Sequence, residues 1–210
     1  EVNRCGAQIS KNAVRDRALV FASVGPTGDF IEPLGTLTVT AAEDMFAEQI
    51  DALLAGGADA IVVETMTDLQ ETLCAVRAAR RVQADVPVVA SLTFDKGARG
   101  YATMMGVTPA TAAEQLAAAD VDVIGTNCGN GIETMIAIVH ELRAHCTLPL
   151  WARPNAGVPQ LVDGTTVFPD SPAAMAGKIA ALRDAGASMI GGCCGTTPAH
   201  IRAIADALRA

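Results

Sequence analysis

The sequence is poor in aromatic residues, in basic clusters and in long apolar runs, and each shortage excludes a class of protein. Aromatic residues make up 3% of the 210 residues, so the core must come from aliphatic side chains, and the length suits one domain over residues 1–210. Acidic residues outnumber basic ones by 23 to 15, and the net charge of −8 argues against nucleic acids and membranes as partners. No apolar run reaches the roughly 20 residues that span a bilayer, and no signal peptide is recognised, so we expect a cytoplasmic protein.

The six cysteines do not form the compact pattern of a secreted disulfide scaffold. A reducing compartment fits better, with some thiols in metal binding or catalysis and the others in the core. Cys5, Cys74 and Cys146 fall within or at the end of predicted helices, and we assign them to packing or to the surface. The three histidines also fall on predicted helices, where a surface or helix-capping role is expected: His140, His145 and His200.

Short apolar segments alternate with amphipathic segments along the whole chain. The apolar segments predict six buried strands, at residues 18–24, 58–65, 86–94, 121–129, 148–153 and 187–192. This alternation predicts βα units and a parallel sheet. The segments ALLAGGADAIVVET and ALRDAGASMIGGCC share one plan of helix, glycine stop, strand and polar exit, which supports a repeated unit.

Capping signals mark the starts of most of the predicted helices. A first helix is expected over residues 3–17 and another over 132–145. The other helices are expected to begin at Thr40 (with Glu43), at Thr67 (with Gln70), at Thr108-Pro109, at Ser171-Pro172 (a helix that includes Met175, Ile179 and Leu182) and at Thr197-Pro198. Residues 29–39 and 158–170 are predicted to be loops.

Polar or glycine-rich residues follow nearly every predicted strand, which favours a closed barrel over a doubly wound open sheet. In a nucleotide-binding open sheet such signals cluster after one strand, whereas a barrel brings all strand exits to one face. The exits are Gly25-Pro26-Thr27-Gly28, Glu64-Thr65, Thr93-Phe94-Asp95, Asn127-Cys128, Pro154-Asn155 and Cys193-Cys194. We therefore predict an α/β fold of the (β/α)8 TIM-barrel type, although six strands are found where a full barrel has eight.

The adjacent Cys193 and Cys194 lie between a predicted strand and a predicted helix, flanked by glycines. Two small buried thiols are one interpretation, and a metal site is the other. On a barrel, Cys128 would reach the same face, and three thiolates are a suitable zinc site that leaves a fourth position open. The nearby helix N-terminus is expected to lower the thiol pKa. Such a site would suit binding of a substrate thiol, or hydrolysis by a zinc hydroxide.

Several of these motifs, in this order, resemble the homocysteine S-methyltransferase family. They are Gly125-Thr126-Asn127-Cys128, Pro154-Asn155-Ala156-Gly157 and Gly191-Gly192-Cys193-Cys194-Gly195-Thr196-Thr197-Pro198, together with Gly25-Pro26-Thr27-Gly28 and Glu64-Thr65. The resemblance covers essentially the whole chain and is strongest to the homocysteine-binding domain of cobalamin-dependent methionine synthases. It implies a zinc barrel that methylates the thiol of homocysteine to give methionine, with Cys128, Cys193 and Cys194 as zinc ligands. It also implies that Glu64 holds the homocysteine amino group, with Thr65 and Asn127 as further substrate contacts.

The resemblance further implies which parts and partners such a barrel needs. Family members begin with two additional strands, so the chain is expected to be a barrel that lacks its first two strands, with two bare edges that favour self-association. The methyl donor is expected to be methylcobalamin, recharged by 5-methyltetrahydrofolate, on cobalamin- and folate-binding domains of the same or another chain; betaine or S-methylmethionine is an alternative donor. Two other functions stay open: a non-catalytic zinc-binding interaction module and a metal-dependent hydrolase or lyase.

Overall fold

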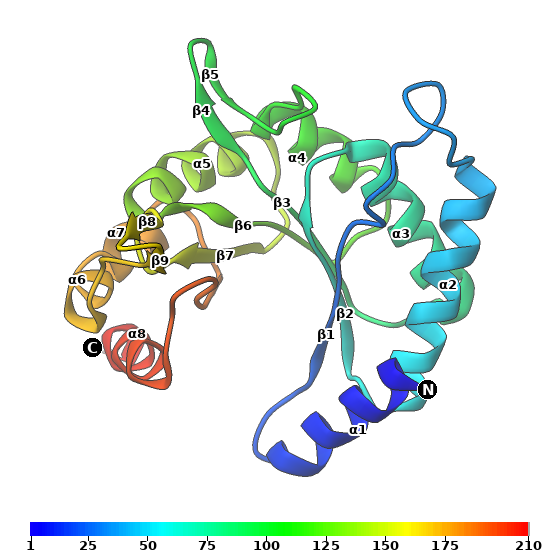
Figure 1. Ribbon diagram of the computed structural model, residues 1–210, viewed down its shortest axis with the longest axis horizontal. Coiled ribbons are helices and arrows are strands. Elements are labelled where there is room, and N and C mark those ends of the chain that lie inside the picture. Colours follow the sequence, from blue (N-terminus) through cyan, green and yellow to red (C-terminus); the bar gives the residue numbers. More distant parts are fainter. Residues whose placement is uncertain (210) are drawn as a thin grey trace.

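The computed structural model describes residues 1–209 and consists of a curled parallel sheet with helices around its outside (Figure 1). The sheet has six strands in the order β1-β2-β3-β6-β7-β10, and every neighbouring pair is parallel. The strands are β1 (Phe21–Val24), β2 (Ala60–Met66), β3 (Val88–Leu92), β6 (Val123–Gly131), β7 (Leu150–Asn155) and β10 (Met189–Ile190). Each strand of this sheet lies next to the strand of the sheet that comes before it in the sequence, which is the arrangement of a TIM barrel wall. The predicted partial TIM barrel is therefore confirmed.

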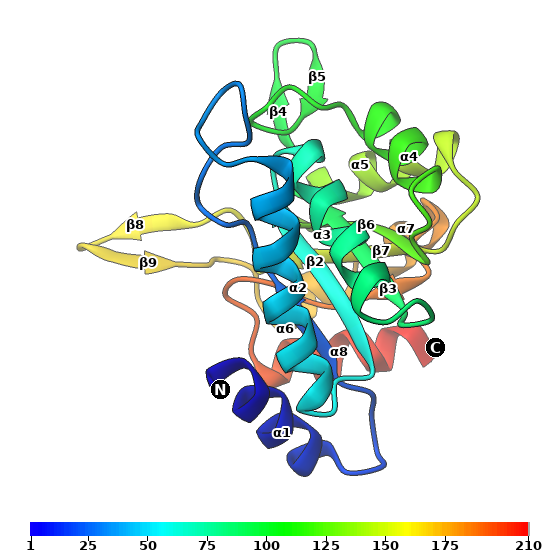
Figure 2. The same cartoon turned by 90° about the vertical axis from the view of Figure 1, so that its right-hand side faces the viewer.

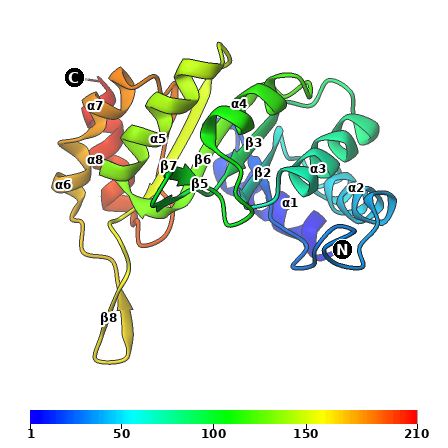
Figure 3. The ribbon, with the colours of Figure 1, turned by 90° about the horizontal axis from the view of Figure 1, so that it is seen from above.

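The helices follow the strands and cover the convex side of the sheet, as Figures 1 and 3 show. They are α1 (Val2–Val14), α2 (Val39–Ala55), α3 (Leu69–Val82), α4 (Pro109–Ala117), α5 (Ile132–His145), α6 (Pro172–Ala176), α7 (Ile179–Asp184) and α8 (Pro198–Arg209). Helix α1 precedes the first strand and is tied to it through Asp59, which accepts hydrogen bonds from Lys11 Nζ at 2.6 Å and from the Val20 amide at 2.7 Å. Because all six strands run the same way, their carboxyl ends form one rim.

The hydrophobic core lies between the sheet and the helices. All five residues of β3 are buried, because a parallel strand in the middle of such a sheet is covered on both faces. Phe46 and Ile50 of α2 and Ile138 and Leu142 of α5 are also fully buried. Most of the buried hydrophobic side chains are aliphatic, which confirms a core with little aromatic content.

Two predicted helix starts and one predicted helix are corrected by the structure. Helix α2 is capped by Thr38 and not Thr40, and α3 is capped by Asp68 and not Thr67, because Asp68 accepts from the amides of Gln70 and Glu71. The helix that was expected from Ser171 onward divides at Gly177-Lys178 into α6 and α7. Glycine is a poor helix former, which accounts for the break. The predicted cap at Thr108 is confirmed.

Two short antiparallel hairpins extend from the body of the molecule. Strand β4 (Asp95–Gly97) pairs with β5 (Gly100–Ala102), and β8 (Gln160–Val162) pairs with β9 (Thr165–Val167). The second hairpin, expected as a loop, projects away from the rest of the chain in Figure 2. It exposes the side chains of Leu161 and Val167.

The first and last strands of the sheet are its edges. Within residues 1–209, β1 pairs only with β2, and β10 pairs only with β7. Strand β10 is two residues long, whereas the sequence predicted a strand over 187–192. In the described part of the chain, no helix combines the length and apolar character that crossing a bilayer requires.

Candidate metal centre

Three thiols meet at the carboxyl rim of the sheet. Cys128 lies in the last part of β6, and Cys193 and Cys194 lie in the loop after β10. The Sγ atoms of all three lie within 4.8 Å of one another, and those of Cys128 and Cys194 are 3.8 Å apart. The predicted convergence of these residues, 65 positions apart in the chain for Cys128 and Cys193, is thus present in the fold.

The separation of two of the thiols fits a tetrahedral metal. Zinc binds thiolates at about 2.3 Å, and tetrahedral angles then place two sulfur atoms about 3.8 Å apart. The separation of the Cys128 and Cys194 sulfurs, 3.8 Å, equals that value. Within residues 1–209, this is the one group of three or more Cys, His, Asp or Glu side chains whose ligand atoms converge in this way. Three thiols leave one tetrahedral position for another ligand.

The cysteine loop is held by the exit of the neighbouring strand β7. The Cys193 amide donates to Pro154 O at 2.9 Å, the Ala156 amide donates to Cys194 O at 2.9 Å, and the Cys194 amide donates to Asn155 Oδ1 at 3.1 Å. Asn155 is buried. The Pro154-Asn155-Ala156 motif therefore positions both cysteines without supplying a ligand.

Glycine is required within this loop for steric reasons. Gly195 has a φ of +77°, and a Cβ at this position would lie 2.2 Å from Phe168 Cγ. Gly192 has no room for a Cβ either, since it would lie 2.5 Å from Thr196 Cγ2. The tight turn between β10 and α8 therefore depends on these two residues.

Cys128 and Thr65 both lie at irregularities in their strands. The register of β6 against β7 shifts between Asn127 and Gly131, and that of β2 against β3 shifts between Val63 and Met66. Cys128 has a φ of 63° and Thr65 a φ of 60°, conformations that residues with a Cβ rarely adopt. Such bulges redirect side chains, and here they redirect two side chains at the site.

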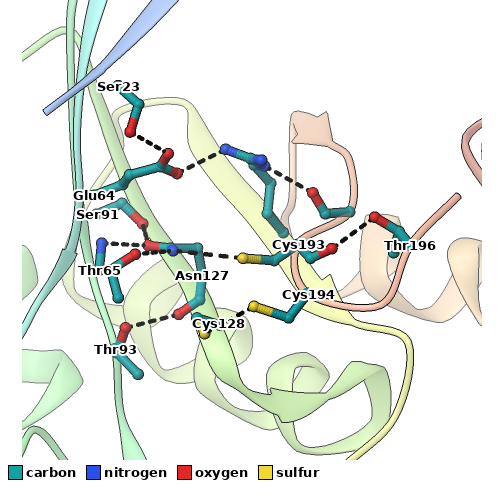
Figure 4. A network of polar contacts seen from close by, with 12 residues as sticks. Ser23, Glu64, Thr65, Ser91, Thr93, Asn127, Cys128, Cys193, Cys194 and Thr196 are labelled. Carbon is teal, nitrogen blue, oxygen red and sulfur yellow. Dashed lines mark hydrogen bonds and ion pairs between the residues drawn. The ribbon is translucent and has the colours of Figure 1, made fainter. Parts of the chain in front are cut away.

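Asn127 joins these two irregular segments. It is completely buried, and its Oδ1 accepts from the Thr65 amide at 2.9 Å and from Ser91 Oγ at 2.7 Å. Its Nδ2 donates to Thr65 Oγ1 at 2.8 Å and lies 4.0 Å from Cys193 Sγ. Figure 4 shows Asn127 pointing between Thr65 and Cys193, with the thiols of Cys128 and Cys194 facing one another. Asn127 thus connects the Thr65 turn to the thiol cluster.

Glu64 lies on the same rim and is paired with a basic residue that the sequence analysis did not single out. Its Oε2 accepts from Arg153 Nη1 at 2.7 Å, and its Oε1 accepts from Ser23 Oγ at 2.7 Å. Arg153 also donates through Nε to Gly192 O at 3.0 Å. Side chains alternate between the two faces of a strand, so Arg153, two residues after Trp151, lies on the same face of β7 as Trp151. This alternation could have suggested Arg153 as a residue of the site.

The expected lowering of the thiol pKa is wrong for Cys194. Burial, together with the neighbouring thiols of Cys193 and Cys128, raises the pKa of Cys194 to about 11. Helix α8 begins only at Pro198, and the effect of a helix terminus falls off within the first turn. The Cys194 thiol therefore favours the protonated form until a cation replaces its proton.

Two more residues of the rim have structural roles. Glu71 is buried, and its Oε1 accepts from both the amide and the hydroxyl of Thr27 at 2.7 Å, which holds the Gly25-Pro26-Thr27-Gly28 turn. His200 is buried and not on the surface: its Nδ1 accepts from the Thr197 amide at 3.1 Å, and its Nε2 lies 2.9 Å from Asp170 O. His200 caps α8, so the capping part of the expectation is confirmed.

The chain is similar in sequence to curated methionine synthases and betaine–homocysteine methyltransferases. The chain is 37% identical over 195 residues to methionine synthase of Mycobacterium tuberculosis, a match that covers 90% of this chain and 16% of that protein. It is 29% identical over 230 residues to betaine–homocysteine S-methyltransferase 1 of Xenopus tropicalis, which covers 99% of this chain and 54% of that protein. The chain therefore spans about one sixth of the first relative and about half of the second.

The fold has a similar counterpart among solved structures. The apo form of the homocysteine methyltransferase MmuM from Escherichia coli superposes with a TM-score of 0.72 at 26% identity, covering 96% of this chain and 67% of that one. Its metallated form superposes with the same TM-score at 25% identity. The sequence profile of the homocysteine S-methyltransferase family matches residues 1–208. The chain thus belongs to the homocysteine S-methyltransferase family.

Proposed function

We propose that Cys128, Cys193 and Cys194 hold a zinc ion that binds the thiol of homocysteine, and that the complete protein transfers a methyl group to this thiol to give methionine. The observation that supports this most directly is the 3.8 Å separation of the Cys128 and Cys194 sulfurs, which suits tetrahedral zinc. Bound zinc would lower the pKa of a coordinated thiol, so that a thiolate is present near neutral pH. Family membership supports homocysteine as the methyl acceptor.

The residues around the thiols have separate parts in this proposal. Asn155 and Pro154 hold the loop of Cys193 and Cys194, and Asn127 fixes the neighbouring Thr65 turn. Glu64 is proposed to bind the ammonium group of homocysteine, since it supplies a partly buried negative charge on the same rim. Direct contacts of Thr65 and Asn127 with the substrate stay predictions.

The methyl donor is proposed to be methylcobalamin, recharged by 5-methyltetrahydrofolate and presented by cobalamin- and folate-binding domains of the same or another chain. The higher identity to methionine synthase supports this choice, and the match to 16% of that protein leaves room for other domains in it. Betaine is the alternative donor, supported by the relative that is 29% identical. Methionine formation from homocysteine, measured with each donor supplied separately, distinguishes the two.

The metal site is tested by zinc content. We expect about one zinc per chain by elemental analysis, and Cys193→Ala should lose most of it because two thiols hold zinc far more weakly than three. Cys146→Ala is the matched control, since Cys146 lies outside the thiol cluster and should leave the zinc content unchanged. Zinc retained at the wild-type level in Cys193→Ala would contradict the assignment. Zinc that is bound without any thiol affinity would instead support a non-catalytic module.

A further inference from the structure

A cavity of about 490 Å³ is lined by Gly192, the residue before Cys193, and Glu64 and Arg153 are the two charged residues that line it. Its walls include Phe21 of β1, Trp151 of β7 and Met189 of β10. Strands β1 and β2 are separated from β7 by β3 and β6 in the sheet, so a cavity bounded by both ends of the sheet lies on its concave side. Most of the other lining residues are apolar, which makes the ion pair the main polar feature of this space.

Arg153 is held in a defined position within this cavity. Its Nε donates to Gly192 O at 3.0 Å, its Nη1 donates to Glu64 Oε2 at 2.7 Å, and its guanidinium carbon lies 5.7 Å from the centre of the Trp151 ring. Trp151 is itself stacked on Phe21, with ring centres 5.9 Å apart. A guanidinium has five N–H donors, so three of them have no partner among the described residues. The group is therefore prepared to bind an additional anion.

Glu64 likewise has capacity for another partner. Each of its oxygens accepts one hydrogen bond, from Ser23 and from Arg153, whereas a carboxylate can accept about four. A cation could therefore bind Glu64 without displacing Arg153. The pair is partly shielded from solvent, with 14% of the Glu64 side chain and 28% of the Arg153 side chain exposed.

Resting on the proposed homocysteine site, we propose that Arg153 binds the α-carboxylate of homocysteine while Glu64 binds its α-ammonium. An α-amino acid presents both charges on one carbon, and the Glu64–Arg153 pair presents the opposite charges 2.7 Å apart. Guanidinium groups favour carboxylates because their N–H donors match the two oxygens. The hydrogen bond to Gly192, which directly precedes Cys193, places this head-group site next to the loop that presents the thiols.

A purely structural role for Arg153 and the proposed binding role predict different effects of its removal on the affinities for different thiols. Arg153 would then only neutralise Glu64 and support the Gly192 carbonyl, and its removal would weaken every thiol ligand equally. A binding role affects only ligands that contain a carboxylate. Three thiols separate the cases: L-homocysteine, 3-aminopropane-1-thiol, which lacks the carboxylate, and 4-sulfanylbutanoate, which lacks the amino group.

The experiment is calorimetric titration of the zinc-loaded chain with these three thiols, for wild type, Arg153→Gln, Arg153→Lys and Glu64→Gln. Arg153→Gln should weaken L-homocysteine and 4-sulfanylbutanoate by about tenfold or more and leave 3-aminopropane-1-thiol unchanged or tighter. Arg153→Lys should restore part of the carboxylate affinity, because it keeps the charge. Glu64→Gln should weaken the two amino-containing thiols instead. Arg77→Gln is the matched control, since Arg77 pairs with Glu43 between α2 and α3, outside the cavity.

Each other outcome has a defined meaning. Equal weakening of all three thiols in Arg153→Gln, or no weakening, would overturn the role of Arg153 and leave the proposed function standing. Absence of binding of any thiol to the zinc-loaded wild type would overturn the proposed function and this inference together. Zinc content is measured for every variant, so that loss of the metal is not mistaken for loss of the carboxylate contact.

Discussion

Replacing Asn127 by alanine tests whether this residue holds the rim of the sheet together. The substitution removes the acceptor of the Thr65 amide and of Ser91 Oγ, together with the donor to Thr65 Oγ1. Ser91 and Asn127 are fully buried, so water does not replace these partners. A buried polar group without a partner costs about 1–3 kcal/mol, and two such groups give an expected loss of about 2–6 kcal/mol in the free energy of unfolding.

Urea unfolding followed by circular dichroism measures this loss, and zinc titration of the same variant measures its effect on the metal site. Residues that orient metal ligands typically change metal affinity by about 10–100-fold, so zinc binding should weaken by at least about tenfold. Asn130→Ala is the matched control: Asn130 is only half-buried, and it should cost about 1 kcal/mol or less. A loss below about 1 kcal/mol in Asn127→Ala, with unchanged zinc affinity, would refute the reasoning.

Three further predictions concern charge and assembly. Glu64→Gln should weaken homocysteine binding in a titration while zinc content stays unchanged, since Glu64 is outside the thiol cluster; equal affinities would refute its role. Lys11, and then the Val20 amide, hold the pKa of Asp59 below its ordinary value of 3.8. The resulting stability is present above pH 3.8 and is lost as the pH falls through the lowered pKa, so unfolding curves of wild type and Asp59→Asn should converge in acid and differ at neutral pH. Light scattering after size exclusion should show self-association through the edges of β1 and β10, which have no partner strand within residues 1–209, whereas a stable monomer with full turnover would contradict this.

The order of strands and helices could be predicted because each βα unit repeats the same pattern of apolar and amphipathic segments. The cysteine cluster could be predicted for a related reason: parallel strands place their exits on one rim, which brings Cys128 and Cys193 to the same side of the sheet. The exact helix starts were harder to predict. Thr38 and Thr40 are equally good capping residues in the sequence, and the backbone geometry chooses between them.

One short local element and several contacts between distant residues were missed. The β8–β9 hairpin has exposed residues and no alternating pattern, and its one local signal is the turn at Asp163-Gly164. The pairing of Glu64 with Arg153 and of Glu71 with Thr27 joins segments that are far apart in the chain. The pKa of Cys194 likewise depends on burial, which a local reading of the helix terminus does not include.

The attachment of the cysteine loop to the exit of β7 has a consequence for protein engineering. Strand β10 has two residues, so the positions of Cys193 and Cys194 depend more on Pro154, Asn155 and Ala156 than on their own strand. The two segments therefore form one exchangeable unit, although more than 30 residues separate them. Grafting the loop of a relative onto this chain should preserve the thiol cluster only if the β7 exit is transferred with it.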